Sequence, residues 1–160
     1  MERETINIRS DSSDWRAAIL SNLALTPFTI GEYTFPSVES ALQGIKFSDR
    51  IIREEVFQLD GLRALKEGRV ITKNIERSNY VFWDDKIIPY NSLEHRLLIA
   101  IFIAEKVRQN PNVQKALLAT NGAFIYHDVG GESSNTSLPE KFYIEILLAQ
   151  RRLLKKLNSL

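Results

Sequence analysis

Apolar residues recur every three to four positions in several stretches of the chain, the spacing that places them on one face of a helix. Most of these stretches follow a residue that can cap a helix, such as Ser37. The pattern predicts helices over residues 38–47, 50–57, 61–68, 91–108, 111–120 and 139–156. Gly68 is expected to end the third helix, and Asn91, with Glu94 three residues later, is expected to begin the fourth.

Short runs of β-branched and aromatic residues predict a smaller set of strands. We expect strands at residues 5–9 and 123–127 and a hairpin across residues 26–35, with its turn at Gly31. The apolar residues within 69–90 follow neither a helical nor a strand spacing, so this segment is interpreted as a loop or a partly extended segment. Helices outweigh strands and do not alternate regularly with them, so the sequence predicts a mostly helical α+β fold with a small sheet rather than a parallel α/β fold.

Composition narrows the class of protein. With 160 residues, 44% of them hydrophobic, the chain is long enough for one domain spanning residues 1–160. The 21 Lys and Arg residues nearly balance the 20 Asp and Glu residues, so no overall field favours a nucleic-acid or membrane binder. There is no cysteine, and the polar start of the chain lacks the apolar region of a signal peptide. We therefore expect a cytoplasmic protein.

The most hydrophobic stretch of the chain raises the question of a membrane segment. Its unbroken apolar run, within residues 97–107, is much shorter than the roughly 20 residues that a spanning helix needs. This stretch is interpreted as a central buried helix, and no membrane partner is expected.

The sequence contains no recognisable metal-binding or phosphate-binding motif. His95 and His127 are far apart and neither has a partner at metal-ligand spacing, so no metal site and no cofactor are predicted. His95 is more simply a partnered histidine between helices. The glycine pair Gly130 and Gly131 is too weak a signal for a phosphate-binding loop.

One predicted helix carries a polar stripe beside its apolar face. Glu39, Gln43 and Lys46 are separated by four and three residues, so they lie on nearly the same side of a helix. With Ser37 as the cap, Glu39 falls in the first turn, where unpaired backbone N–H groups favour an anion. The pattern alone fits either a solvated Glu/Lys face or a polar site.

The surrounding sequence resembles a known family. The block SNLALTPFTIGEYTFPSVESALQGIKFSD, followed by ALKEGR, a Trp, AEKVRQNP and LLAT-x-G, is similar to the NADAR, or YbiA-like, family of N-glycosidases. The resemblance covers roughly residues 6–155. It implies a mostly helical α+β fold and cleavage of a ribosyl N-glycosidic bond. Riboflavin-pathway ribosylamine intermediates and ADP-ribosylated guanine are family substrates, so the implied partner is a small nucleotide or an ADP-ribosylated nucleic-acid base.

The resemblance also implies roles for individual residues. The motif Glu of the family falls on Glu39, its Lys on Lys46, its Ser-Asn pair on Ser21 and Asn22, and its Trp on Trp83. Glu39 would stabilise the sugar cation and orient water, with Lys46 as its partner. Asn22 would contact the base or the ribose, and Trp83 would stack on the base. A turn residue and a packing residue are the alternatives for these last two.

Further candidates complete the predicted site. Asp128 would be a second catalytic carboxylate, with Gly130 or Gly131 as its neighbouring family glycine, and Gln43 would bind substrate. Arg69 would contact phosphate, or would simply neutralise the end of a helix.

The segment around Asp128 differs from the family pattern. The chain has YHDVGGESS where the family has Asp-x-x-Trp-Gly, and the Trp has no counterpart. Two alternatives to an enzyme therefore remain. One is a catalytically impaired module that binds a nucleotide or ADP-ribose, and the other is an interaction protein that uses its basic C-terminal helix as a contact surface.

Overall fold

The centre of the molecule is the long helix α6, Leu93–Gln109, which contacts elements from both halves of the chain. The computed structural model describes residues 2–72, 79–131 and 136–160. Around α6 the other helices are α1 Trp15–Leu20, α2 Val38–Gly44, α3 Arg50–Phe57, α4 Gly61–Thr72, α7 Pro111–Ala119 and α8 Glu140–Asn158. The mostly helical α+β fold that the sequence predicts is confirmed.

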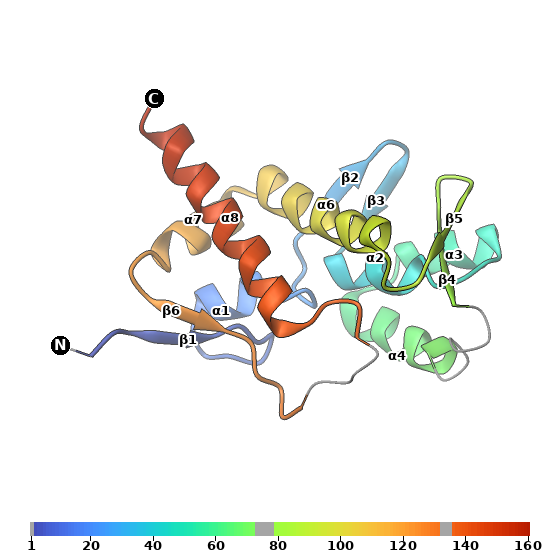
Figure 1. Cartoon of the computed structure of the whole chain (residues 1–160), viewed down its shortest axis with the longest axis horizontal. Helices are drawn as coiled ribbons and strands as arrows, with labels where there is room; N and C mark the ends of the chain where they lie inside the picture. Colours follow the sequence, from blue (N-terminus) through green and yellow to red (C-terminus); the bar gives the residue numbers. More distant parts are fainter. Residues whose placement is uncertain (1, 73–78, 132–135) are drawn as a thin grey trace.

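Within the described residues, the strands form three separate pairs rather than one small sheet. They are β1 Thr5–Asn7, β2 Phe28–Ile30, β3 Tyr33–Phe35, β4 Tyr80–Trp83, β5 Lys86–Pro89 and β6 Phe124–Tyr126. The pair β1–β6 is parallel, whereas β2–β3 and β4–β5 are antiparallel hairpins. Figure 1 shows the β1–β6 pair and the β4–β5 hairpin at opposite ends of the molecule, with α6 and α8 between them.

The hairpin β4–β5 lies in the segment for which the sequence pattern gave no period. Its two turn residues, Asp84 and Asp85, both have positive φ angles, 48° and 62°. Positive φ at both turn positions is the geometry of a two-residue hairpin turn, and Asp tolerates it better than most residues. The predicted hairpin with Gly31 at its turn is confirmed, with Gly31 at φ 58°.

One helix was not predicted and several helix bounds differ from the sequence prediction. The missed helix is α1, whose six residues are too few to show a helical period; Asp14 caps it. Helix α2 ends at Gly44 rather than at residue 47, and α8 continues to Asn158 rather than ending at residue 156. Helix α6 is capped by Ser92, whose side chain accepts the His95 N–H, while Asn91 adopts φ 60°. Helix α4 does not end at Gly68 but continues to Thr72.

The core is a single cluster of buried apolar side chains drawn from most of the elements. Helix α6 supplies Ile99, Phe102, Ile103 and Val107 to it, each at most 1% exposed. The predicted central buried helix is therefore confirmed. No helix in the described ranges is both long and apolar enough to cross a membrane.

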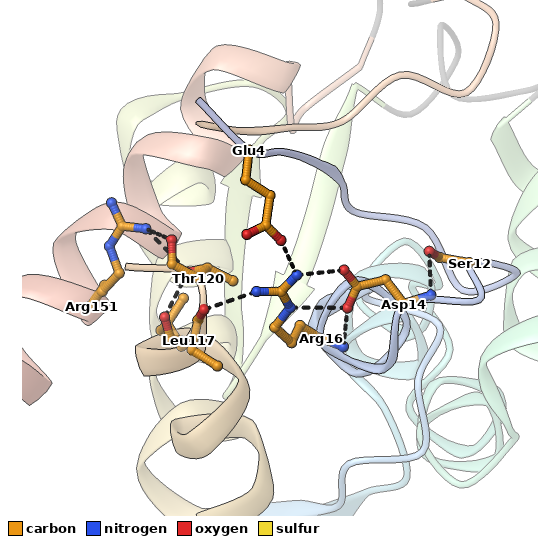
Figure 2. Close-up of polar contacts among 8 residues, drawn as sticks. Glu4, Ser12, Asp14, Arg16, Leu117, Thr120 and Arg151 are labelled. Carbon is orange, nitrogen blue, oxygen red and sulfur yellow. Dashed lines mark hydrogen bonds and ion pairs between the residues drawn. The ribbon is translucent and has the colours of Figure 1, made fainter. Parts of the chain in front are cut away.

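Polar contacts fix the short helix α1 against the C-terminal half of the chain (Figure 2). The Arg16 guanidinium makes ion pairs with Glu4 and Asp14 and donates to the Ala119 carbonyl at 3.0 Å. Nearby, Arg151 of α8 donates to the Thr120 carbonyl at 2.9 Å. Because the residues that follow α1 are Ser21 and its neighbours, this network anchors one end of a segment that reaches the candidate site.

Candidate functional site

The site is built on the first turn of α2. Ser37 caps the helix as predicted, and its side chain accepts the N–H of Ser40 at 3.2 Å. The Glu39 N–H donates to the backbone carbonyl of Asn22 at 2.9 Å. The backbone that carries the Glu39 carboxylate is therefore tied to the Ser21–Asn22 segment at the end of α1.

The three predicted stripe residues, Glu39 and Gln43 of α2 and Lys46 in the turn that follows it, lie on the wall of one cavity of about 320 Å³. Gln43 Nε2 donates to Glu39 Oε1 at 2.6 Å. Glu39 and Lys46 are half-buried, while Gln43 is only 7% exposed. The cavity is lined by Asn22, Glu39, Leu42, Gln43, Lys46, Tyr90, His127, Thr136, Ser137 and Leu138.

Two acceptor atoms beside this cavity are buried without a hydrogen bond. Asn22 Oδ1 and Gln43 Oε1 find no partner among the described residues. The donor bond from Gln43 to Glu39 identifies which end of that amide is the oxygen. Buried acceptors of this kind are usually satisfied, so a ligand that brings N–H or O–H groups fits this part of the wall.

Burial pushes the carboxylate and the amine of the site toward their neutral forms. It raises the pKa of Glu39, against the hydrogen bond from Gln43 and the attraction of Lys46 and Arg69. It lowers the pKa of Lys46, against the attraction of Glu39. A carboxyl with a raised pKa and an amine with a lowered pKa, in one cavity, are typical of functional sites.

Buried groups from α6 and α8 hold the segment that joins α1 to the site. Tyr143 Oη donates to the Leu20 carbonyl at 2.5 Å, and Lys106 Nζ donates to the Ser21 carbonyl at 2.7 Å. Together with the Glu39 N–H on Asn22, three consecutive carbonyls each receive a donor from a different helix. Burial lowers the pKa of Lys106 to about 7.

Asp128 lies beside the Glu39 cavity rather than in it. It lines a neighbouring cavity of about 450 Å³, which shares His127, Thr136 and Leu138 with the first. The Asp128 carboxylate accepts the Gly130 N–H at 2.9 Å, and Gly130 has φ 98°. The structure thus places Asp128 and Gly130 together in one exposed turn, next to the Glu39 cavity.

Trp83 and Arg69 are not among the residues that line the Glu39 cavity. The Trp83 ring packs against Tyr33, Phe35, Phe57 and Phe102, with ring centres 5.3 to 6.3 Å away. This arrangement matches the packing role that the sequence left open. Arg69 is exposed on α4 and acts on Glu39 only through its charge.

Ser21 contributes its backbone rather than its side chain. Its hydroxyl accepts the Leu23 N–H at 3.2 Å and the residue is 6% exposed. The motif residues Asn22, Glu39, Gln43 and Lys46 are the ones that line a common cavity.

Several residues of the site escaped the sequence pattern. Lys106 and Tyr143 lie in apolar helical stretches, and Tyr90 and Leu138 lie in segments without a period. His127 lines both cavities, and its Nδ1–H donates to the Ile8 carbonyl at 2.7 Å. Unlike the other four residues, His127 is indicated by the sequence, because the His127–Asp128 pair ends a predicted strand just before a glycine-containing loop.

His95 has the structural role that its sequence position favoured. It is 2% exposed, and its Nδ1 accepts the Asn91 N–H at 3.0 Å. Burial and the nearby positive charges of Lys46 and Arg96 lower its pKa to about 4, so the ring is neutral at pH 7.

The fold is that of a YbiA-like α+β protein. The solved structure of the Escherichia coli protein YbiA matches with a TM-score of 0.69 and 21% sequence identity, covering 99% of this chain and 89% of that one. At this identity the likeness establishes the fold.

The chain belongs to the bacteriophage protein GP30.3 family, whose model matches residues 14–152. A curated relative from Enterobacteria phage T4 is described as an uncharacterized 17.1 kDa protein in the Gp30–rIII intergenic region. It is 29% identical over 144 residues, which cover 89% of this chain and 93% of the relative.

Proposed function

We propose that the protein is an N-glycosidase of the NADAR type, which hydrolyses a ribosyl N-glycosidic bond in a nucleotide-type substrate. The observation that carries this proposal is the Glu39 carboxylate on a cavity wall, hydrogen-bonded to Gln43 at 2.6 Å and attracted to Lys46. The motif resemblance and the YbiA-like fold support it. ADP-ribosylated guanine and riboflavin-pathway ribosylamine intermediates are the substrate classes to test.

The reaction needs a negative charge beside the anomeric carbon. As the bond between this carbon and the base nitrogen breaks, its electron pair leaves with the base and the sugar becomes an oxocarbenium-like cation. Glu39 stabilises that cation and accepts a proton from the attacking water, whose oxygen bonds to the anomeric carbon. The raised pKa of Glu39 makes it a stronger base for this step. The departing base takes up a proton.

The remaining cavity residues bind and orient the substrate in this proposal. Lys46 balances the charge of Glu39 or contacts a phosphate, and the unpartnered Asn22 Oδ1 accepts a hydrogen bond from ribose or base. Gln43 contributes through its hydrogen bond to Glu39. The neighbouring turn of Asp128 contacts the part of the substrate that extends into the second cavity.

The test is base release from a panel of ribosyl phosphates, NAD, ADP-ribose and oligonucleotides with ADP-ribosylated guanine. We expect wild type to release base from at least one of them and Glu39→Ala to lose at least a hundredfold in kcat/KM. Glu94→Ala is the matched control, because Glu94 also lies in the first turn of a helix but is exposed outside the cavity. No release by wild type, or equal rates for Glu39→Ala, would show the proposal to be wrong.

A specific observation favours a second candidate function, a module that binds a nucleotide or ADP-ribose without cleaving it. The predicted second carboxylate, Asp128, is exposed and is engaged in its own turn with Gly130. Calorimetry with ADP-ribose separates the two candidates. Binding that depends on Asn22 and Gln43, with no base release from any substrate of the panel, would support the module.

A further inference from the structure

Helices α2 and α4 pack against each other, and Gln43 of α2 meets Gly68 of α4. A Cβ atom built on Gly68 would lie 1.6 Å from Gln43 Oε1, 2.3 Å from its Cδ and 2.8 Å from its Cγ. Every one of these atoms belongs to the Gln43 side chain. Gly68 therefore leaves the space that the Gln43 amide occupies, and any larger residue at position 68 displaces that amide.

The amide of Gln43 is the group that holds the catalytic candidate. Its nitrogen donates to Glu39 Oε1 at 2.6 Å, while its oxygen lies where a side chain of residue 68 would begin. The two ends of the amide thus face a carboxylate and the backbone of α4. We propose that Gly68 is a positioning residue for Glu39, which acts by leaving room for Gln43 to hold the carboxylate in place.

The position of Gly68 within its helix supports a functional reason for the glycine. Gly68 lies inside α4, four residues before its end at Thr72. Alanine is more favourable than glycine in a helix interior, so helix stability alone favours alanine here. The atoms in the way are the far end of a flexible side chain, which can swing aside. The Gly68→Ala protein should therefore fold, with its cost concentrated on the contact between Gln43 and Glu39.

The pKa of Glu39 distinguishes the loss of this contact from a loss of folding. The hydrogen bond from Gln43 opposes the rise in the pKa of Glu39 that burial causes. Lys46, just after α2, and Arg69 on α4 act in the same direction as Gln43. Tyr143 of α8 and His127 also face the carboxylate or its cavity. If only the Gln43 bond is lost, the pKa of Glu39 must rise further.

The experiment is an NMR titration of the Glu39 side-chain carboxyl, assigned by the signal that disappears in Glu39→Gln. It compares wild type, Gly68→Ala, Gln43→Ala and the double variant. We expect the Glu39 pKa to rise in both single variants and to be the same in the double variant as in Gln43→Ala. An unchanged pKa in Gly68→Ala, or a further rise on adding Gly68→Ala to Gln43→Ala, would overturn the proposal.

Stability and turnover complete the test. Gly68→Ala should raise the melting temperature in the Gln43→Ala background, where nothing is displaced and the helix gains from alanine. In the otherwise wild-type protein the same change should raise it less or lower it, because the displaced amide loses its bond to Glu39. If Gly68→Ala does not fold, removal of the Gln43 side chain in the double variant must restore folding. A double variant that also fails to fold would contradict the mechanism. Leu62→Ala, a neutral change at an exposed position of α4, is the control that should leave the Glu39 pKa unchanged.

The consequence for turnover rests on the proposed glycosidase function. Given that function, kcat/KM should fall about tenfold or more in Gly68→Ala, as expected for losing a hydrogen bond to a charged group. The titration does not need turnover. A protein that releases no base would refute the glycosidase proposal and leave the role of Gly68 testable by the Glu39 pKa alone.

Discussion

The two walls of the Glu39 cavity are built in different ways. One wall consists of α2 and the segment Leu20–Asn22, whose polar groups are buried and bound by donors from three helices. The other consists of residues 127–131 and 136–138, in which Asp128 and its glycine neighbours are exposed. The Asp128 backbone exchanges hydrogen bonds with the Asn7 side-chain amide, and the Asp128 carboxylate accepts the Gly130 N–H within its own turn.

The difference separates two requirements of a binding site. Chemistry on a sugar cation needs a carboxylate fixed in place before the substrate arrives, because reorganisation during the reaction raises the barrier. Recognition of the outer part of a substrate tolerates an exposed turn. We infer that the α2 wall carries the chemistry and that the Asp128 wall carries recognition.

The largest expected effect compares one carboxylate from each wall. Glu39→Gln should lower kcat by about 10²- to 10⁴-fold, because the amide cannot accept the proton of water or stabilise a cation. Asp128→Asn should raise KM and change kcat by less than about tenfold, as expected for an exposed contact with substrate. Steady-state kinetics on one substrate checks both. A larger loss of kcat in Asp128→Asn than in Glu39→Gln would reverse the assignment of the two walls.

The next effect concerns the buried amine that holds the α2 wall. The folded-state pKa of Lys106, about 7, lies below its ordinary value of 10.5, so between these pH values the unfolded chain binds more protons. Stability should therefore rise with pH above 7, by at most about 1.4 kcal/mol per pH unit from this group.

Urea unfolding of wild type and Lys106→Met at pH 7, 8 and 9 measures this contribution. Lys106→Met should lack it, and the difference between the two proteins cancels the contributions of other groups such as Lys46. The Ser21 carbonyl keeps a hydrogen bond from the Ala24 N–H, so Lys106→Met should still fold. Parallel pH slopes for the two proteins would show that Lys106 titrates normally and that its burial does not constrain the wall.

The sequence predicted the α2 wall better than the rest of the site, for a local reason. A capping serine and a helical period are properties of neighbouring residues, so they place Glu39, Gln43 and Lys46 on one side without knowledge of the fold. Lys106 is the opposite case. Its position predicts only that it belongs to the central helix. The packing of α6 against the end of α1 is what makes it a buried donor.

Gly68 shows how a local rule fails for a tertiary reason. A glycine after a helical stretch usually marks its end, yet α4 continues to Thr72. The glycine instead meets a side chain of another helix, because Gln43 fills the space beside it. The same holds for Trp83, whose partners Phe35, Phe57 and Phe102 come from three other elements. Contacts between distant segments leave no trace in the spacing of residues within one segment.

Trp83 provides a control that lies outside both walls. Trp83→Leu should lower the free energy of unfolding by about 1–3 kcal/mol, because a half-buried ring loses contacts with four aromatic neighbours. The kcat/KM of the folded protein should stay within about twofold of wild type. Chemical denaturation gives the first quantity and kinetics at low temperature the second. A loss of turnover without a loss of stability would restore the stacking role that the sequence proposed for Trp83.

The smallest effect is expected at Arg69, behind the α2 wall. Its positive charge lowers the pKa of Glu39, so Arg69→Gln should raise that pKa. Because Arg69 is exposed, water and salt screen the attraction, and the effect on kcat/KM should correspond to less than about 1 kcal/mol. Titration of the Glu39 carboxyl at low and high salt measures it, and the difference from wild type should shrink as salt increases. A large, salt-independent loss of substrate affinity would instead mean that Arg69 contacts a phosphate directly and belongs to the site.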